Sequence, residues 1–349
     1  MPPSSILKFN YPVQGLRGVA AMSVFLFHIY DMSLKQGVLP ENIPLPIKAA
    51  LLSLSSGVDL FFMISGYLIV ASLIRHANVR SFLADRIIRI YPVFLFLHIS
   101  LFAIVPLAHY KWLANISFGP WLLHFFTNLF FLPGMFDLPL LQLNAWSLSY
   151  EFAFYLFCVG VYSLLARCRW AGWLLLAAAA PAIIFFYPRA AFFAVGAGIF
   201  FLLRQPSGYV SRVPALGLMC VPVFFVLIGY AYSSDNPQLC WLAIPPAFFL
   251  FLDITRGIRP LSGILSHKAA QFLGMISYSF YLWHPVVTYP LKLVMAKILV
   301  EKMGINPLVA VFIFGALSLA ITLPVSYLSY LLLEKRSKKI LKKAIAAYA

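Results

Sequence analysis

The stretch GLRGVAAMSVFLFHIY, residues 15–30, decides the fold because it is an apolar run with ionisable residues inside it. It has the character of a membrane-spanning helix, which needs about 20 mostly apolar residues. Arg17 lies near one end and His28 lies eleven residues further on, roughly 16 Å along a helix axis and close to three full turns, so the two side chains share one face. Both are costly in hydrocarbon, which favours a polar path along this helix. The alternative is an arginine at the membrane surface and a histidine bonded to a neighbouring helix.

The rest of the chain has the composition of an integral membrane protein. Of its 349 residues, 62% are hydrophobic and 10% are charged, whereas soluble domains are about half apolar and about a quarter charged. We expect an all-α, polytopic transmembrane helix bundle with about ten spans. The expected spans are 14–33, 54–75, 90–109, 148–166, 171–188, 190–204, 213–232, 239–254, 272–299 and 307–333. The shorter apolar segment 119–133 is expected to be re-entrant or interfacial, and residues 1–349 are expected to form one integral membrane domain without a separate soluble domain.

The positions of the basic residues predict the orientation in the membrane. With the N-terminus inside, most of the 26 Lys and Arg residues fall on the cytoplasmic side, as the positive-inside rule requires. An even number of spans then puts both termini in the cytoplasm, and we expect a multi-pass protein of the inner or plasma membrane. The net charge of +16 is therefore mainly a topology signal rather than a sign of nucleic-acid binding. The basic tail EKRSKKILKK, residues 334–343, is expected to lie against anionic lipid headgroups.

Two carboxylates begin other spans on the predicted outer side. Asp59 lies in GVDLFFMISGYLI, residues 57–69, and Glu151 lies in NAWSLSYEFAFYLF, residues 144–157. Both are expected at a depth similar to that of His28, where a carboxylate would orient the imidazole and increase its basicity for general-base catalysis. The alternative for each carboxylate is a role at the helix N-terminus. The predicted donors to a reaction oxyanion are Trp146, Ser149 and Tyr155.

A pair of arginines lies on the predicted cytoplasmic side. Arg86 and Arg89 are three residues apart in FLADRIIRIYP, residues 82–92, and so share one helix face. With Arg17 they would form a guanidinium cluster, which favours multidentate contacts to phosphate. The alternative is that the pair only satisfies the positive-inside rule.

A second histidine lies near the middle of the ninth expected span. His284 is followed by Pro285 in SYSFYLWHPVVTYP, residues 277–290. Proline inside a helix frees a backbone carbonyl, and such positions in membrane proteins commonly line cavities. His284 is therefore expected to border the same polar path as His28, or to form a hydrogen bond across two packed helices.

Together these motifs resemble the acyltransferase-3 family of integral membrane acyltransferases, which modify sugars and other acceptors at the cell envelope. The Gly-x-Arg-Gly signature and the histidine that follows it are matched within residues 15–28. Four further blocks occur in the family's order, at residues 57–67, 86–92, 146–156 and 277–285. The end of the chain departs from the family, with EKRS where many relatives have Glu-Lys-Pro-Phe.

The resemblance implies residue roles, substrates and partners. It implies that His28 is the catalytic base, that Arg17, Arg86 and Arg89 bind the donor, and that Glu151 and Trp146 shape the acceptor side. The donor would be cytoplasmic acyl-coenzyme A, often acetyl-coenzyme A, with no tightly bound cofactor and no metal. The acceptor would be a hydroxyl of an envelope polysaccharide or glycolipid, and separate glycan-assembly proteins are expected partners.

Two questions stay open at this point. The acyl group could pass directly to the acceptor or through an acyl-histidine, since imidazole is also a nucleophile. A secondary transporter of an anionic or sugar substrate is the alternative function. Such transporters commonly contain internal repeats with paired broken helices, and the chain shows no convincing repeat of the helix that carries Arg17 and His28.

Overall fold

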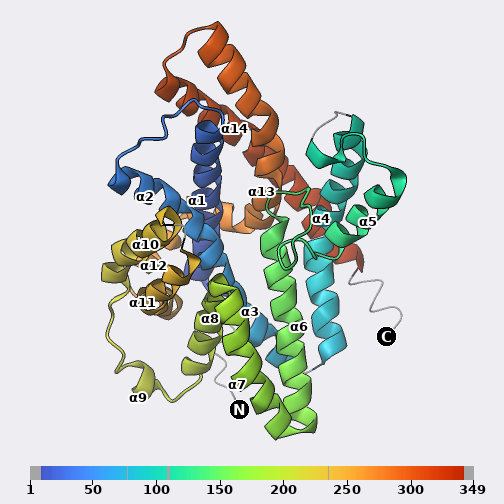
Figure 1. Ribbon diagram of the computed structural model, residues 1–349. Helices are drawn as coiled ribbons and strands as arrows, with labels where there is room; N and C mark the ends of the chain where they lie inside the picture. Colours follow the sequence, from blue (N-terminus) through green and yellow to red (C-terminus); the bar gives the residue numbers. More distant parts are fainter. Residues whose placement is uncertain (1–8, 77, 108–110, 235, 342–349) are drawn as a thin grey trace.

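The computed structural model describes residues 9–76, 78–107, 111–234 and 236–341, and these residues form a bundle of helices (Figure 1). The α-helices are α1 (Tyr11–Lys35), α2 (Leu45–Ser53), α3 (Gly57–His76), α4 (Val79–Leu107), α5 (Phe118–Leu129), α6 (Ala145–Arg167), α7 (Arg169–Phe186), α8 (Ala191–Leu202), α9 (Ser207–Val210), α10 (Gly217–Ser233), α11 (Ile244–Arg256), α12 (Leu261–Leu265), α13 (Lys268–Leu293) and α14 (Pro307–Ser329). Short 3₁₀ helices are η2 (Leu54–Ser56), η3 (Lys111–Leu113), η4 (Pro188–Ala190) and η5 (Pro237–Ala243). Two segments are π-helical, η6 (Val294–Lys302) and η7 (Tyr330–Lys335).

The helices confirm an all-α membrane protein. Within the described residues, 7 helical segments are long and apolar enough to cross a bilayer. These are Tyr11–Lys35, Leu45–His76, Val79–Leu107, Ala145–Arg167, Arg169–Phe186, Gln238–Arg256 and Pro307–Leu341. Each of the ten expected spans falls on helical segments within the described residues, and the end of the span 90–109 lies outside them. The spans expected on α8, α10 and α13 are not among the seven, and α8 and α10 are short. The number of crossings and the side of the termini stay predictions.

Helix α5 is too short to cross the membrane as a straight helix. Its 12 residues rise about 18 Å, whereas the hydrocarbon core is about 30 Å thick. Apolar side chains such as Phe118, Leu123 and Phe126 are exposed on it. Its buried Asn128 donates to the carbonyl of Pro139 at 2.9 Å and accepts from the backbone N–H of Leu141 at 3.1 Å. This amide therefore fixes the loop that leads from α5 toward α6.

Helix α1 lies between the α10–α12 helices and the α13–α14 pair (Figure 1). Its N-terminus is capped by the side chain of Asn10, which accepts from the backbone N–H of Val13 at 3.1 Å. This bond satisfies one of the backbone donors that every helix start leaves unpaired. The cap fixes where α1 begins, and with it the height of Arg17 and His28 in the bundle.

Glycines bring α1 and α13 close together. A β-carbon on Gly18 would lie 2.6 Å from the backbone nitrogen of Gly274, and one on Gly274 would lie 2.0 Å from the carbonyl oxygen of Gln14. Any larger residue at either position would therefore push the helices apart. The contacts between Gly18 and Gly274 and between His28 and His284 have the same offset in sequence, so the helices run parallel. This close parallel packing brings the two histidines within hydrogen-bonding distance.

Candidate active site

Two histidines on these parallel helices are hydrogen-bonded to each other. The Nδ1 atom of His28 on α1 lies 2.8 Å from the Nε2 atom of His284 on α13. The rings of Phe25 and Phe280 lie beside His284, with centroids 6.0 and 5.8 Å from the imidazole. His284 is fully buried, whereas His28 keeps 8% of its surface exposed. His28 is therefore the member of the pair that another molecule can reach.

The hydrogen-bond partners assign the tautomers of this pair. The Nδ1 atom of His284 lies 2.9 Å from the carbonyl oxygen of Phe280, and because a carbonyl only accepts, Nδ1 carries the hydrogen. The amide nitrogen of Asn144, a donor, lies 3.4 Å from Nε2 of His284, so Nε2 is an acceptor. His28 must then donate from Nδ1, which leaves a free lone pair on its Nε2 atom. That lone pair is the group a general base requires.

The expectation that Asp59 orients His28 is wrong. Asp59 is fully buried at the start of α3 and pairs with Arg189 on η4, through contacts of 2.7 Å from Nε to Oδ1 and 3.0 Å from Nη2 to Oδ2. Arg189 also donates to the carbonyl oxygen of Ser55 at 3.2 Å. A buried carboxylate requires a cation or several donors, and Arg189 supplies both. His284 takes the place beside His28 that the sequence assigns to a carboxylate.

Arg189 also contacts two aromatic rings. Its guanidinium carbon lies 5.1 Å from the ring centroid of Trp146 and 5.1 Å from that of Tyr232, a favourable cation–π geometry. Trp146 also lies beside Tyr150 and Phe62, with ring centroids 5.6 and 6.3 Å away. Arg189 therefore joins the starts of α3 and α6 to α10. The role of Trp146 at the acceptor side stays a prediction.

The three predicted donor-site arginines line one cavity among α1, α3, α4, α6 and α13. Arg17, Arg86 and Arg89 form part of its wall, and Ser147 and Tyr281 form another part. Its volume is about 60 Å³, which is enough for a few water molecules. The sequence thus groups these arginines correctly, although α1 and α4 are far apart in the chain.

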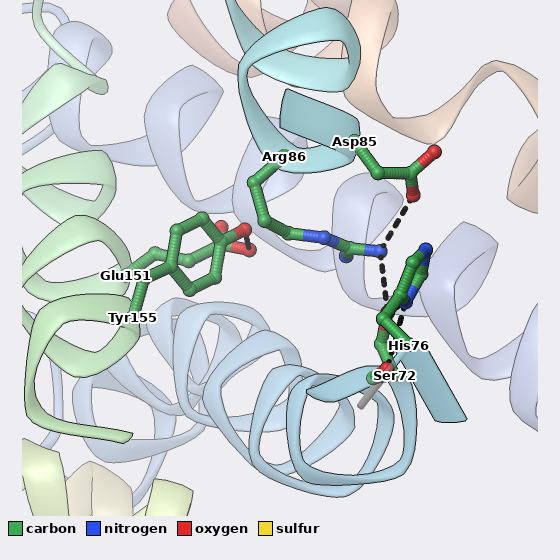
Figure 2. A network of polar contacts seen from close by, with 6 residues as sticks. All are labelled: Ser72, His76, Asp85, Arg86, Glu151 and Tyr155. Atoms are coloured by element: carbon green, nitrogen blue, oxygen red, sulfur yellow. Dashed lines mark hydrogen bonds and ion pairs between the residues drawn. The ribbon is translucent and has the colours of Figure 1, made fainter. Parts of the chain in front are cut away.

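Two neighbours bind Arg86 directly (Figure 2). Its Nη2 atom donates to Oγ of Ser72 at 3.2 Å and to Oδ2 of Asp85 at 3.1 Å. Ser72 in turn accepts, through its backbone carbonyl, from Nδ1 of His76 at 2.8 Å. The Nε atom of Arg86 is buried without a hydrogen-bond partner among the described residues. The Nε–H of Arg86 is thus a donor that the described residues leave unused.

Glu151 belongs to this arginine cluster and not to the histidine pair, which corrects the expected position. It lines the cavity with Arg17, Arg86 and Arg89. Its carboxylate accepts from Tyr155 (Figure 2) and also from Oγ of Ser65 at 3.3 Å. The reason is that α6 begins deep in the bundle, since Asn144 just before it already contacts His284. Seven residues further along, about 10 Å, the helix has reached the arginines.

Ser147 and Tyr281 lie between the cavity and the histidine pair. Their hydroxyl oxygens are 2.8 Å apart, both residues line the cavity, and the Tyr281 ring centroid is 6.0 Å from that of His284. Ser149, a predicted oxyanion donor, instead donates to the carbonyl oxygen of Pro133 at 2.5 Å. The hydroxyl groups that face the cavity near the histidines are therefore those of Ser147 and Tyr281.

The sequence from residue 10 to residue 328 matches a family described as an acyltransferase domain. The chain belongs to the acyltransferase-3 family. The match covers nearly the whole chain and confirms the resemblance drawn from the motifs. No curated protein and no solved structure matches this chain. The protein is therefore a membrane acyltransferase.

The sequence does not single out several residues of this candidate site. Tyr281 precedes His284 by three residues and so shares its helix face, a signal that could have found it. Arg189 is a lone cation on the predicted outer side, next to an apolar run, and so departs from the positive-inside rule. Asn144 carries no comparable signal, because a polar residue before a helix is common.

Replacement of His284 tests its role as a positioning residue in the acyltransferase. His284→Leu removes the acceptor for Nδ1–H of His28, so we expect kcat to fall on the order of 100-fold, the lower end of what a positioned base contributes. In His284→Gln the side-chain oxygen can still accept that hydrogen, so much of the activity should remain. The measurement is kcat and KM over a range of pH.

Equal activities in the two His284 variants would contradict this role. A purely structural His284 would also lower the amount of folded protein without changing the pH profile of what remains.

Proposed function

We propose that the protein is an O-acyltransferase that moves an acyl group, most simply acetyl, from cytoplasmic acyl-coenzyme A to a hydroxyl of an extracytoplasmic sugar, polysaccharide or related acceptor. The observation that carries the proposal is the directed hydrogen-bond chain from His28 through His284 to the carbonyl of Phe280. This hydrogen-bond chain leaves a free lone pair on Nε2 of His28. Tyr281 links the histidine pair to the arginine-lined cavity, because it lines that cavity and its ring centroid lies 6.0 Å from that of His284. Within the described site, no other side chain is both partly exposed and held by a hydrogen bond that leaves a basic nitrogen lone pair free.

The proposed reaction uses His28 twice. Its Nε2 atom takes the proton of the acceptor hydroxyl as the hydroxyl oxygen attacks the thioester carbonyl. The tetrahedral oxyanion then collapses, the carbon–sulfur bond breaks, and the imidazolium returns its proton to the leaving thiolate. A chemical quench with labelled acetyl-coenzyme A in the absence of acceptor distinguishes this direct route from an acyl-histidine, because only the latter leaves label on His28.

A hydroxyl group at the end of the cavity fits the oxyanion. Donors aimed at the developing charge are commonly the largest catalytic contribution in acyl transfer. Ser149 is bonded to a backbone carbonyl and Tyr155 to Glu151. Ser147 likewise donates to the carbonyl oxygen of Asn144 at 2.9 Å, so it accepts from the hydroxyl of Tyr281, which lines the cavity beside the histidine pair. We therefore propose Tyr281 as the oxyanion donor in place of Ser149 and Tyr155; its hydroxyl would exchange its bond to Ser147 for one to the oxyanion.

The arginine cluster fits the donor. Guanidinium groups bind phosphate oxygens through paired hydrogen bonds, and acyl-coenzyme A carries several phosphates. Apolar side chains such as Phe61 and Leu68 also line this cavity and fit the uncharged pantetheine arm that follows the phosphates. The predicted orientation places these arginines toward the cytoplasm, where acyl-coenzyme A is found, in an inner or plasma membrane.

Substitution of Arg89 tests the donor assignment. Arg89→Gln removes one charged donor from the cavity wall, so we expect KM for acetyl-coenzyme A to rise about tenfold, the value of one charge-assisted hydrogen bond, with a smaller change in kcat. Arg89→Lys keeps the charge but loses the paired hydrogen-bond geometry. Its KM for acetyl-coenzyme A should therefore lie between the values of wild type and Arg89→Gln. Arg80→Gln, an exposed arginine on the same helix, is the matched control. Equal changes in KM for the Arg80 and Arg89 variants would contradict donor binding. Arg86 and Arg89 would then only satisfy the positive-inside rule.

A further inference from the structure

Glu334 lies close to the donor-site arginines although it belongs to the C-terminal segment. It sits on η7, the π-helical continuation of α14. Its Oε1 atom accepts from Oγ of Ser279 at 2.5 Å and from the backbone N–H of the same residue at 3.2 Å. Ser279 follows two residues that line the cavity, Ser277 and Tyr278. The carboxylate is therefore fixed to the stretch of α13 that carries these two lining residues, although Glu334 itself does not line the cavity.

The charge of Glu334 acts on two of these arginines. Arg17 and Arg89 are each within electrostatic range of Glu334 and of Glu151, and Arg17 is also repelled by Arg89. Helix α4, which carries Arg89, packs directly against η7. Glu334 thus offsets a repulsion between two partly buried guanidinium groups, a state that is costly without nearby negative charge.

The arginine cluster is balanced by carboxylates from the protein itself. Arg17, Arg86 and Arg89 are accompanied by Asp85, Glu151 and Glu334. A polyanionic donor that enters the site must therefore compete with negative charge that is already present. Repulsion between like charges lowers affinity, so the carboxylates decide how tightly the donor is held.

Among these carboxylates, Glu334 is placed to affect donor binding separately from the rest of the site. Asp85 is in direct contact with Arg86, and Glu151 is bonded inside the cavity. Glu334 is bonded to Ser279 instead, and it sits on a π-helix, an uncommon geometry that is frequent at functional sites. Its removal would change the charge of the site without removing a ligand of an arginine.

We propose that Glu334 is the internal counter-ion of the donor site: it balances Arg17 and Arg89 when no donor is bound, weakens the binding of coenzyme A, and so speeds release of that product. The inference rests on the proposed function, because it presumes that the arginines bind the phosphates of coenzyme A. Removing one negative charge near a bound phosphate, in surroundings of intermediate dielectric, should tighten binding about tenfold.

The test compares two glutamates that both lie on π-helices. The full chain in neutral-lipid nanodiscs is titrated with coenzyme A by calorimetry at low ionic strength, as wild type, Glu334→Gln and Glu301→Gln. Glu301 is exposed on η6, so its variant loses the same charge away from the cavity. We expect Glu334→Gln to bind coenzyme A about tenfold more tightly than wild type, with a gap that narrows as salt screens the charges, and Glu301→Gln to bind like wild type.

The outcomes separate this inference from the proposed function. A wild type that binds no coenzyme A overturns both. A wild type that binds, together with a Glu334→Gln variant of equal or weaker affinity, overturns only the role of Glu334. Equal tightening in the Glu301 variant overturns it as well, because the effect would then follow from net charge alone.

A double variant covers the case in which Glu334→Gln does not fold. Arg17→Gln combined with Glu334→Gln removes one cation and one carboxylate, so the cluster keeps its charge balance. We expect this double variant to bind coenzyme A more tightly than Arg17→Gln alone. The same or weaker affinity in the double variant would overturn the proposal.

Discussion

His28→Ala is expected to lower acyl transfer about 10³-fold, within the range that a positioned general base contributes. The variant loses the Nε2 lone pair that the hydrogen bond to His284 leaves free. The measurement is incorporation of labelled acetyl from acetyl-coenzyme A into envelope glycan, at matched amounts of folded protein. The KM for acetyl-coenzyme A is expected to change less than the rate of acyl transfer, because His28 does not line the arginine-lined cavity.

The control for this prediction is another histidine of the same chain. His267 is exposed at the N-terminus of α13, where its ring accepts from the backbone N–H of Ala269 at 3.3 Å. His267→Asn keeps a capping side chain and should keep full activity. Undiminished labelling in His28→Ala would remove His28 as the base and leave the histidine pair a structural contact between α1 and α13.

Arg189→Gln is expected to destabilise the protein by roughly 3–5 kcal/mol, because it leaves a buried charge without its partner. Asp59 is fully buried, and its two carboxylate oxygens both accept from Arg189. The loss should appear as a lower midpoint of thermal unfolding in detergent and as less protein in the membrane. The stacking of Trp146 on the guanidinium would be lost in the same variant.

A neutral double variant separates the ion pair from general packing damage. Asp59→Asn combined with Arg189→Gln removes both charges and can keep a hydrogen bond, so it should recover a large part of the stability lost by Arg189→Gln alone. If the double variant is as unstable as the sum of the single changes, the two residues are not coupled and the ion pair does not hold α3 to η4.

Much of the fold was open to prediction from local sequence. Hydropathy locates the helices because every backbone polar group in a bilayer must be paired within its own segment. The spacing of Arg86 and Arg89 places them on one helix face, and the structure puts both in the wall of the cavity. Segment 119–133 is short, and α5 within it is indeed too short to cross.

Side-chain partners were not open to prediction in the same way. His28 and His284 are 256 positions apart, and Asp59 and Arg189 are 130 apart. A composition or periodicity argument says that a buried charge needs a partner but not which residue supplies it. The prediction that Glu151 lies at the depth of His28 was also wrong. The depth of Glu151 depends on where α6 begins in the bundle, and Asn144 places that start beside His284.

The sequence by itself determined that this chain is a helical membrane protein of the acyltransferase-3 family, with ionisable residues inside its apolar helices. It could do so because the length of an apolar run and the order of motifs are read directly along the chain. Only the tertiary structure decided that a histidine, and not a carboxylate, orients His28, and that Glu151 and Glu334 lie among the arginines. The physical reason is helix packing: the close approach of α1 to α13 at Gly18 and Gly274 fixes which side chains meet.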